Sequence, residues 1–122
     1  MQDIMSGDVV KTTAETPVAE VAREMVKARV GSAIVMQGSW LIGILSERDV
    51  LRAAASGKDL TTSPASEWMT KDPTTATPDT TSDEAAQLML QGGFRHLPVV
   101  EGREVKGVVS IRDLLAARIR RP

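Results

Sequence analysis

The sequence GILSERD at residues 43–49 recurs as GVVSIRD at residues 107–113. Both copies read Gly, two apolar residues, then Ser-x-Arg-Asp, and they lie 64 positions apart. The same offset aligns other identical pairs without a gap: Met5 with Met69, Asp8 with Asp72, Thr16 with Thr80, Glu20 with Glu84, Met25 with Met89, Val35 with Val99, and Leu51 with Leu115. Identities this numerous at one offset indicate an internal duplication, which decides the whole fold.

The duplication divides the chain into a first repeat over residues 1–56 and a second over residues 67–122. Residues 57–66 lie between them and are rich in Gly, Ser, Thr and Pro, so we predict a linker there.

Each repeat predicts the order β-α-β-β-α. In the first, Thr16 is the expected N-cap before Pro17, because proline suits the first helical position. Apolar residues then follow one helix face: Val18, Val21, Ala22, Met25 and Val26. The other expected elements are strands 33–36 and 41–45 and helix 46–55, then a strand within 74–82, helix 83–91, strands 97–100 and 105–109, and helix 111–120.

One such repeat cannot bury its apolar faces alone, whereas two stacked repeats can. We therefore expect a mixed α/β (α+β) fold of two tandem units packed as one pseudo-two-fold module. Such packing leaves two related clefts where the repeats meet.

Composition excludes several functions. The chain has 122 residues, a net charge of −1, no cysteine and one histidine, His96. Disulfides, thiolate chemistry, and His-based catalytic or metal clusters within one chain are therefore excluded. No apolar run approaches the roughly 20 residues that span a bilayer, and no signal peptide is recognisable. We expect a cytoplasmic, non-catalytic protein with no cofactor, no metal and no membrane partner.

The repeated motif has a structural and a functional interpretation. Ser followed three residues later by an acidic residue is typical of a capping box, and in the structural interpretation Ser46 and Ser110 only cap helices. The same geometry also directs backbone N–H groups toward an anion at a helix N-terminus. Asp49 and Asp113 can then accept hydrogen bonds from ribose hydroxyls, while Arg48 and Arg112 can bind phosphate, because a guanidinium group presents a planar fork of donors.

The duplication, the motif in both halves, and RHLPVV at residues 95–100 resemble the CBS-domain pair, over residues 4–118. The resemblance implies two β-α-β-β-α units that dimerise into a disc. It further implies that AMP, ADP, ATP or a related adenosine compound binds in the clefts. Such modules regulate an attached enzyme or channel, or stand alone.

The resemblance also implies roles for individual residues. Asp49 and Asp113 match ribose-binding aspartates, with Ser46 and Ser110 as adjacent hydroxyl donors. Thr13 and Thr77 match positions that border adenine, and Arg95 and His96 match a phosphate-facing pair on a strand stiffened by Pro98. Val10, Ile34 and Leu97 would sandwich the base, or else they are plain core residues. The first repeat has Gly31 and Ser32 in place of Arg95 and His96, which predicts a weaker phosphate grip there.

Alternatives remain open at this point. The chain could be a structural dimerisation module without a ligand, an enzyme, or a nucleic-acid binder through its C-terminal arginines; the last two are disfavoured. His96 could be structural, and Trp40 and Trp68 could be packing or dimer-surface residues. A homodimer is expected because the second helix of each repeat carries apolar residues that one module cannot fully cover: Val50, Leu51, Ala54, Leu114, Leu115 and Ile119. The adenosine compound and the regulated partner are left undetermined.

Overall fold

The computed structural model describes residues 1, 4–5, 7 and 9–119. The chain forms two compact units, which we call the N-unit, residues 8–73, and the C-unit, residues 1–7 together with 74–122. The described residues form four α-helices, one 3₁₀ helix and two sheets, so the expected mixed α+β fold class is confirmed. No helix in the described ranges combines the length and the apolar character that a membrane crossing needs.

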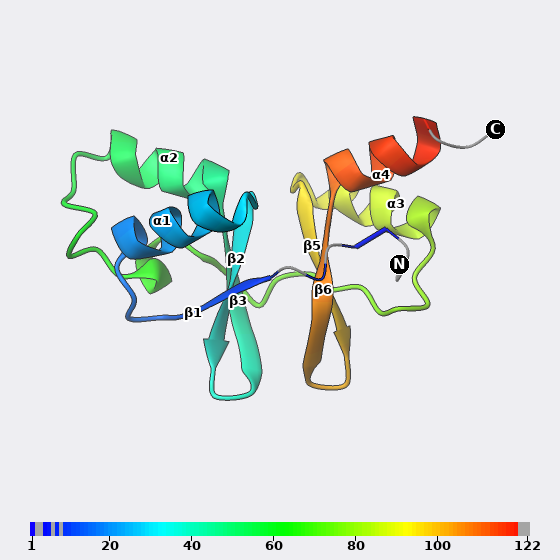
Figure 1. Ribbon diagram of the computed structural model, residues 1–122, viewed down its shortest axis with the longest axis horizontal. Coiled ribbons are helices and arrows are strands. Elements are labelled where there is room, and N and C mark those ends of the chain that lie inside the picture. Colours follow the sequence, from blue (N-terminus) through cyan, green and yellow to red (C-terminus); the bar gives the residue numbers. More distant parts are fainter. Residues whose placement is uncertain (2–3, 6, 8, 120–122) are drawn as a thin grey trace. The chain divides into compact units, whose positions relative to one another are not determined.

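The N-unit is built on a four-stranded sheet in the order β1-β2-β3-β4. Strand β1 pairs parallel with β2, whereas β2 and β3 form an antiparallel hairpin and β4 pairs antiparallel with β3. Figure 1 shows α1 and α2 side by side at one end of this hairpin, whose turn points away from them. The elements are β1 (Val10–Thr13), α1 (Val18–Ala28), β2 (Ser32–Gln37), β3 (Trp40–Ser46), α2 (Glu47–Ala55), the 3₁₀ helix η1 (Ala65–Glu67) and β4 (Thr70–Lys71).

The C-unit repeats the helix–hairpin–helix order of the N-unit. Its elements are α3 (Ser82–Gly92), β5 (His96–Glu101), β6 (Glu104–Ser110) and α4 (Ile111–Ile119). The strand expected within residues 74–82 is not formed there; one parallel bridge joins Ala76 to Val99 instead. Two backbone hydrogen bonds of 2.8 Å, Ala76 N to Pro98 O and Val100 N to Ala76 O, fix this bridge. Pro78 lacks a backbone N–H, which limits extension of the ladder.

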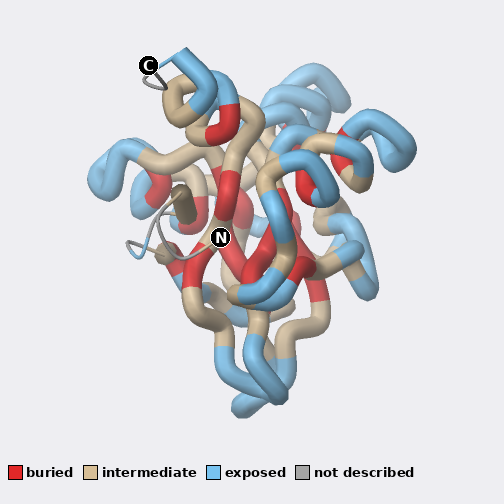
Figure 2. The backbone as a smooth tube through the Cα atoms, turned by 90° about the vertical axis from the view of Figure 1, so that its right-hand side faces the viewer, coloured by how far each residue is buried: buried red, intermediate tan, exposed pale blue. Residues whose placement is uncertain are grey.

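Each unit has its own buried core on the helix-facing side of its hairpin. Figure 2 shows burial concentrated along the strands, while the hairpin turns are exposed. Buried apolar side chains form the two clusters: Val10, Val21, Met25, Ala33, Val35, Leu45 and Ala65 in the N-unit, and Ala76, Ala85, Met89, Leu97, Val99, Val109 and Leu114 in the C-unit. The helix face predicted for α1 is correct at Val18, Val21 and Met25, but Val26 is 78% exposed.

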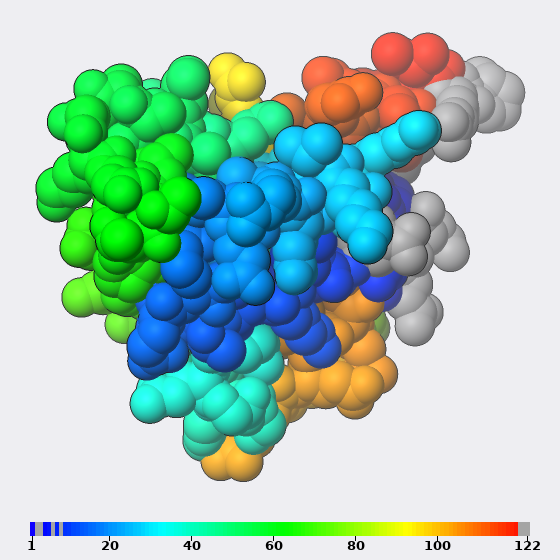
Figure 3. All heavy atoms as spheres, turned by 60° about the vertical axis from the view of Figure 1, so that its left-hand side comes forward, coloured from blue at the N-terminus to red at the C-terminus, as the bar shows by residue number. Residues whose placement is uncertain are grey.

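The start of α1 differs from the expected cap. Pro17 takes the N-cap position with extended backbone and Val18 begins the helix, while the Thr16 hydroxyl lies 2.7 Å from that of Thr13. The backbone N–H groups of Val18 and Ala19 donate instead to Ser63 O and Leu60 O of the linker. In the space-filling view the linker atoms lie directly against this segment (Figure 3). The linker therefore caps α1, which local sequence could not reveal.

The two units exchange the segments that lead into each repeat. Residues 65–69 span the end of the predicted linker and the start of the second repeat, yet Ala65, Trp68 and Met69 pack against the N-unit core. Conversely, Met1, Ile4 and Met5 pack against the C-unit core. The hydrogen bonds correspond at the 64-residue offset: Ala65 N donates to Thr16 O, and Met1 N donates to Thr80 O. Compact units and sequence repeats therefore have different boundaries.

Candidate functional site

Both strand–helix junctions contain a capping box. The backbone N–H of Asp49 donates to Ser46 Oγ over 3.2 Å, and Ser46 N donates back to Asp49 Oδ2 over 2.9 Å. The corresponding distances for Asp113 and Ser110 are 3.1 and 2.9 Å. The capping interpretation of the motif is thus realised in both repeats. In each junction Oδ2 of the aspartate accepts a hydrogen bond from the serine backbone at the start of the helix. The other carboxylate oxygen, Oδ1, takes no part in the capping box.

The second oxygen has different surroundings in the two units. Asp49 Oδ1 accepts a hydrogen bond from Arg52 Nη1 at 3.3 Å, one helical turn further along α2. Ala116 stands at the corresponding position of α4. No hydrogen bond or ion pair reaches Asp113 Oδ1 from the described residues of the C-unit. Asp49 is buried and engaged at both oxygens, whereas Asp113 is half-buried and has an acceptor available within its unit.

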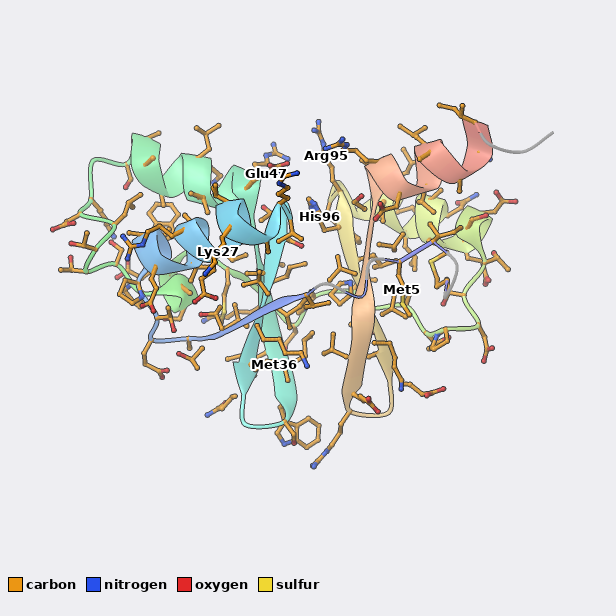
Figure 4. The ribbon with its side chains drawn as sticks, in the orientation of Figure 1. Met5, Lys27, Met36, Glu47, Arg95 and His96 are labelled. Carbon is orange, nitrogen blue, oxygen red and sulfur yellow. The ribbon has the colours of Figure 1, made fainter. Side chains whose placement is uncertain are left out.

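Cationic side chains gather at the junction in the C-unit. Strand β5 places His96 opposite Ser110 of β6, and Ile111 N donates to Arg95 O over 2.9 Å. The predicted residues Arg95, His96, Ser110, Arg112 and Asp113 are therefore brought together at one end of the hairpin. Arg95 and Arg112 are exposed and form no salt bridge among the described residues, and Figure 4 shows Arg95 and His96 adjacent at this end of β5.

The N-unit has the same backbone arrangement with different side chains. Ser32 lies opposite Ser46, and Glu47 N donates to Gly31 O over 2.8 Å. The junction thus brings Ser46, Arg48 and Asp49 together, but Gly31 and Ser32 supply no cation. The two junctions therefore differ in charge, and unequal binding of phosphate by the two repeats stays a prediction.

The predicted base-sandwiching residues are deeply buried. Val10 and Leu97 belong to the two core clusters, at 8% and 0% exposure. Ile34 opposes Ile44 and Pro98 opposes Val108 across their hairpins, and both Ile34 and Pro98 are fully buried. Core packing accounts for Val10 and Leu97 in this structure. Contact of Val10, Ile34 or Leu97 with a base stays a prediction, as does the stiffening of the ligand-binding strand by Pro98.

The two threonines lie away from the junctions of their own units. Thr13 pairs with Met36, four residues along β2 from Ser32, a separation of about 13 Å at strand spacing. Thr77 follows the bridge at Ala76, and its backbone N–H donates to Thr80 Oγ1 over 3.0 Å. Neither threonine joins the serine and aspartate within its unit, so their role beside adenine stays a prediction.

A cation–aromatic cluster beside Asp49 was not anticipated. The Trp68 ring has Arg52 Cζ at 6.0 Å and Lys58 Nζ at 5.8 Å from its centroid, and Lys58 also pairs with Glu67 at 3.3 Å. Trp68 is half-buried against the N-unit core, which confirms its expected packing role. The three-residue spacing of Asp49 and Arg52 on a helix could have indicated their pairing. Trp68 gave no such signal, because it joins them only through the exchanged segment.

The amino-acid sequence matches a known protein family in both repeats. The CBS domain family matches residues 1–56 and 65–120. An uncharacterized 17.7 kDa protein of Acidianus ambivalens is 42% identical over 102 residues, which cover 82% of this chain and 61% of that protein. The CBS domain-containing protein YhcV of Bacillus subtilis is 33% identical over 93% of this chain and 81% of its own length. This chain spans only about one fifth of similar Arabidopsis thaliana CBS proteins.

Solved structures agree in fold. A signal-transduction protein with CBS domains from Burkholderia ambifaria has a TM-score of 0.87 at 29% identity, covering 93% of this chain and 85% of that chain. The CBS domain pair of protein MJ0100, solved with 5′-methylthioadenosine and S-adenosyl-L-methionine, has a TM-score of 0.87 at 25% identity, covering 96% and 97%. The duplicated junctions and these matches together show that the chain belongs to the CBS domain family and carries a tandem pair of CBS domains.

Proposed function

We propose that this CBS pair is a non-catalytic regulatory module that binds an adenosine compound. The observation that carries the proposal is the C-unit junction, where Asp113 has a carboxylate oxygen unengaged within its unit beside Arg95 and His96. Ribose and phosphate recognition are both available there, on one face of the chain's second repeat.

The chemistry of the junction suits a nucleoside phosphate. Asp113 Oδ1 can accept hydrogen bonds from vicinal ribose hydroxyls, and an ionised acceptor makes such bonds about twice as strong as neutral ones. Arg95 and Arg112 can pair with phosphate, and the first turn of α4 adds backbone N–H groups and the positive end of the helix dipole. AMP, ADP and ATP all present this combination of groups.

A relative of known ligand supports the ribose assignment. The MJ0100 pair was solved with 5′-methylthioadenosine and S-adenosyl-L-methionine, which share the adenosine moiety but carry no phosphate. Relatives are described as CBS domain-containing or signal-transduction proteins, in keeping with a non-catalytic role. The single histidine and absent cysteine leave few groups for covalent or acid–base chemistry.

Self-association is the second candidate function. On α2 and α4, Leu51, Leu115 and Ile119 are 70%, 54% and 82% exposed. Exposed apolar side chains of this size favour a protein partner, and a homodimer is the simplest one. Val50 and Leu114, which we had also expected at the surface, pack instead against the cores of their own units.

Calorimetry with AMP, ATP and 5′-methylthioadenosine tests the ligand proposal. We expect Asp113→Asn to weaken AMP binding by about tenfold or more, since a hydrogen bond to a charged group contributes about 1.5–3 kcal/mol. Asp49→Asn is the matched control and should change the affinity less than threefold. Arg95→Ala should weaken AMP but spare 5′-methylthioadenosine, which has no phosphate. If the wild-type chain binds no adenosine compound below millimolar concentration, the ligand proposal is wrong and self-association remains.

A further inference from the structure

We infer that Arg52 is a latch that lowers the affinity of the N-unit junction for an adenosine ligand. The inference rests on the proposed function and concerns the repeat that the proposal leaves weak. We thereby attribute a lower ligand affinity of the N-unit junction to two causes. One is the Arg52 side chain, and the other is that Gly31 and Ser32 stand where the C-unit has Arg95 and His96.

The hydrogen bonds of Asp49 carry the first step. Oδ2 accepts from Ser46 N at 2.9 Å and from Ser46 Oγ at 3.0 Å, and Oδ1 accepts from Arg52 Nη1 at 3.3 Å. A ribose diol recognised by this carboxylate would approach Oδ1, the atom that Arg52 occupies. Ligand binding therefore has to displace the guanidinium or share its acceptor.

Trp68 and Lys58 carry the second step. The Arg52 side chain is 62% exposed, and an ion pair so exposed is weak when it stands alone. Here the guanidinium also lies 6.0 Å from the centre of the Trp68 ring, at the outer limit of a cation–π contact. The ring itself is fixed in the N-unit core by the exchanged segment. Arg52 is thus held between the ring and the carboxylate, while Lys58 uses the same ring and pairs with Glu67.

The C-unit has the carboxylate but lacks both the arginine and the tryptophan of this latch. Ala116 corresponds to Arg52, and Ile4 corresponds to Trp68. Ile4 packs against the C-unit core but offers no aromatic ring to a cation. The duplication thus provides an internal control, because Arg52→Ala gives the N-unit the residue that the C-unit already has.

The test isolates the N-unit by working in an Asp113→Asn background, with 5′-methylthioadenosine as the titrant. This probe has the ribose diol but no phosphate, so removal of an arginine cannot weaken it by loss of a phosphate contact. Adding Arg52→Ala should tighten binding by about threefold to tenfold, the range that an exposed ion pair and a cation–π contact together allow. Arg52→Lys should stay closer to the parent, and a third substitution, Asp49→Asn, should abolish the gain.

Arg118→Ala is the matched control, since Arg118 is an exposed arginine paired with Asp83 at 3.4 Å, on α4. It should leave the affinity unchanged. A decrease or no change with Arg52→Ala overturns the latch, and so does failure of the Arg52→Ala chain to bind while wild type binds AMP. If wild type itself binds no adenosine compound, the proposed function fails first. Thermal unfolding of each variant verifies that affinities are compared between folded proteins.

Discussion

At the scale of single residues, packing within the N-unit explains why a glycine stands at position 43 of the repeated motif. A Cβ atom on Gly43 would lie 2.5 Å from Met69 Sδ and 3.0 Å from Thr70 O. The groups that approach this glycine closely are the start of β4 and the exchanged segment before it. In the first repeat, the motif therefore contains one residue required for packing, Gly43, beside the serine and aspartate that form the capping box.

Gly43→Ala should lower the free energy of unfolding by about 1–3 kcal/mol, the usual cost of overpacking. The Met69 side chain can move, but the Thr70 carbonyl belongs to the β3–β4 ladder and cannot yield cheaply. Urea denaturation measures the change. In a Met69→Ala background the cost should fall, because one of the two clashes is removed, and an equal cost in both backgrounds would contradict this explanation.

Asp49 and Asp113 show which features of the candidate site the sequence could predict. The sequence predicted that both aspartates cap a helix, because a capping box is a local pattern, and it also offered ribose binding as a second interpretation. It could not say that Asp49 is engaged at its second oxygen, since Arg52 draws part of its support from Trp68, which lies in another repeat of the sequence. Side-chain pairing across distant segments is decided by tertiary structure.

At the scale of elements, α3 has a complete capping box that α1 lacks. Thr81 Oγ1 accepts from Glu84 N at 3.1 Å, and Glu84 Oε1 accepts from Thr81 N at 3.0 Å. Thr81→Ala should therefore destabilise the protein by about 1 kcal/mol in urea denaturation. Gln87→Ala, an exposed change on the same helix, should stay within about 0.5 kcal/mol. Equal effects of the two would show that the cap is unimportant.

The same cap predicts a pH dependence. Hydrogen bonds from the Thr81 backbone and side chain hold the pKa of Glu84 below its ordinary value of 4.5. The Thr61 hydroxyl and N–H likewise lower the pKa of Asp59 from 3.8. Because the folded-state values are depressed, their contribution is present above the ordinary pKa values and is lost as the pH falls through the lowered ones.

The unfolding free energy, measured from pH 7 downward, should therefore decline in the acid range, and the slope should be smaller in Glu84→Gln. Thr77→Ala, a threonine outside the cap, should leave the slope unchanged. An unaltered slope in Glu84→Gln would contradict the cap as its source.

Element boundaries were predictable where the signal is local and not elsewhere. Both hairpins and all four helices follow from periodicity and turn residues, within one or two positions. The start of α1 moved to Val18 because the linker, distant in sequence, supplies its cap acceptors. The strand expected at residues 74–82 shrank to Ala76, where Pro73 and Pro78 bound the segment.

At the scale of the whole molecule, the core of the C-unit includes residues that precede the N-unit in the chain. Ile4→Ala should destabilise the C-unit by about 1–2 kcal/mol, less than a fully buried truncation, because Ile4 is half-buried there. Amide hydrogen exchange should quicken in α3 and β5 more than in β2. Val26→Ala, at a 78% exposed position, is the control and should change neither. Faster exchange confined to the N-unit would contradict the assignment of residues 1–7.

Self-association is testable at the same scale. Light scattering should give twice the chain mass of 13.1 kDa, as expected for a homodimer. The double substitution Leu51→Glu and Leu115→Glu should yield the monomer mass, because charge on an apolar contact is costly to bury. Lys11→Glu, an exposed change on β1, is the control. A monomer at all micromolar concentrations contradicts the homodimer, and a larger mass would match the hexameric CBS-CP12 relative, which has 29% identity and a TM-score of 0.88.

The exchange of lead segments also sets an order of events during protein synthesis. The N-unit is continuous, so it has all its residues once position 73 has left the ribosome. Residues 1–7 precede the N-unit in the chain and emerge before it, yet they belong to the C-unit, so they have no partners until residues 74–119 have been synthesised. During that interval Met1, Ile4 and Met5 are apolar residues without a core. A pause in elongation between residues 73 and 119 should prolong this exposure, and nascent chains stalled there should bind chaperones through Met1, Ile4 and Met5.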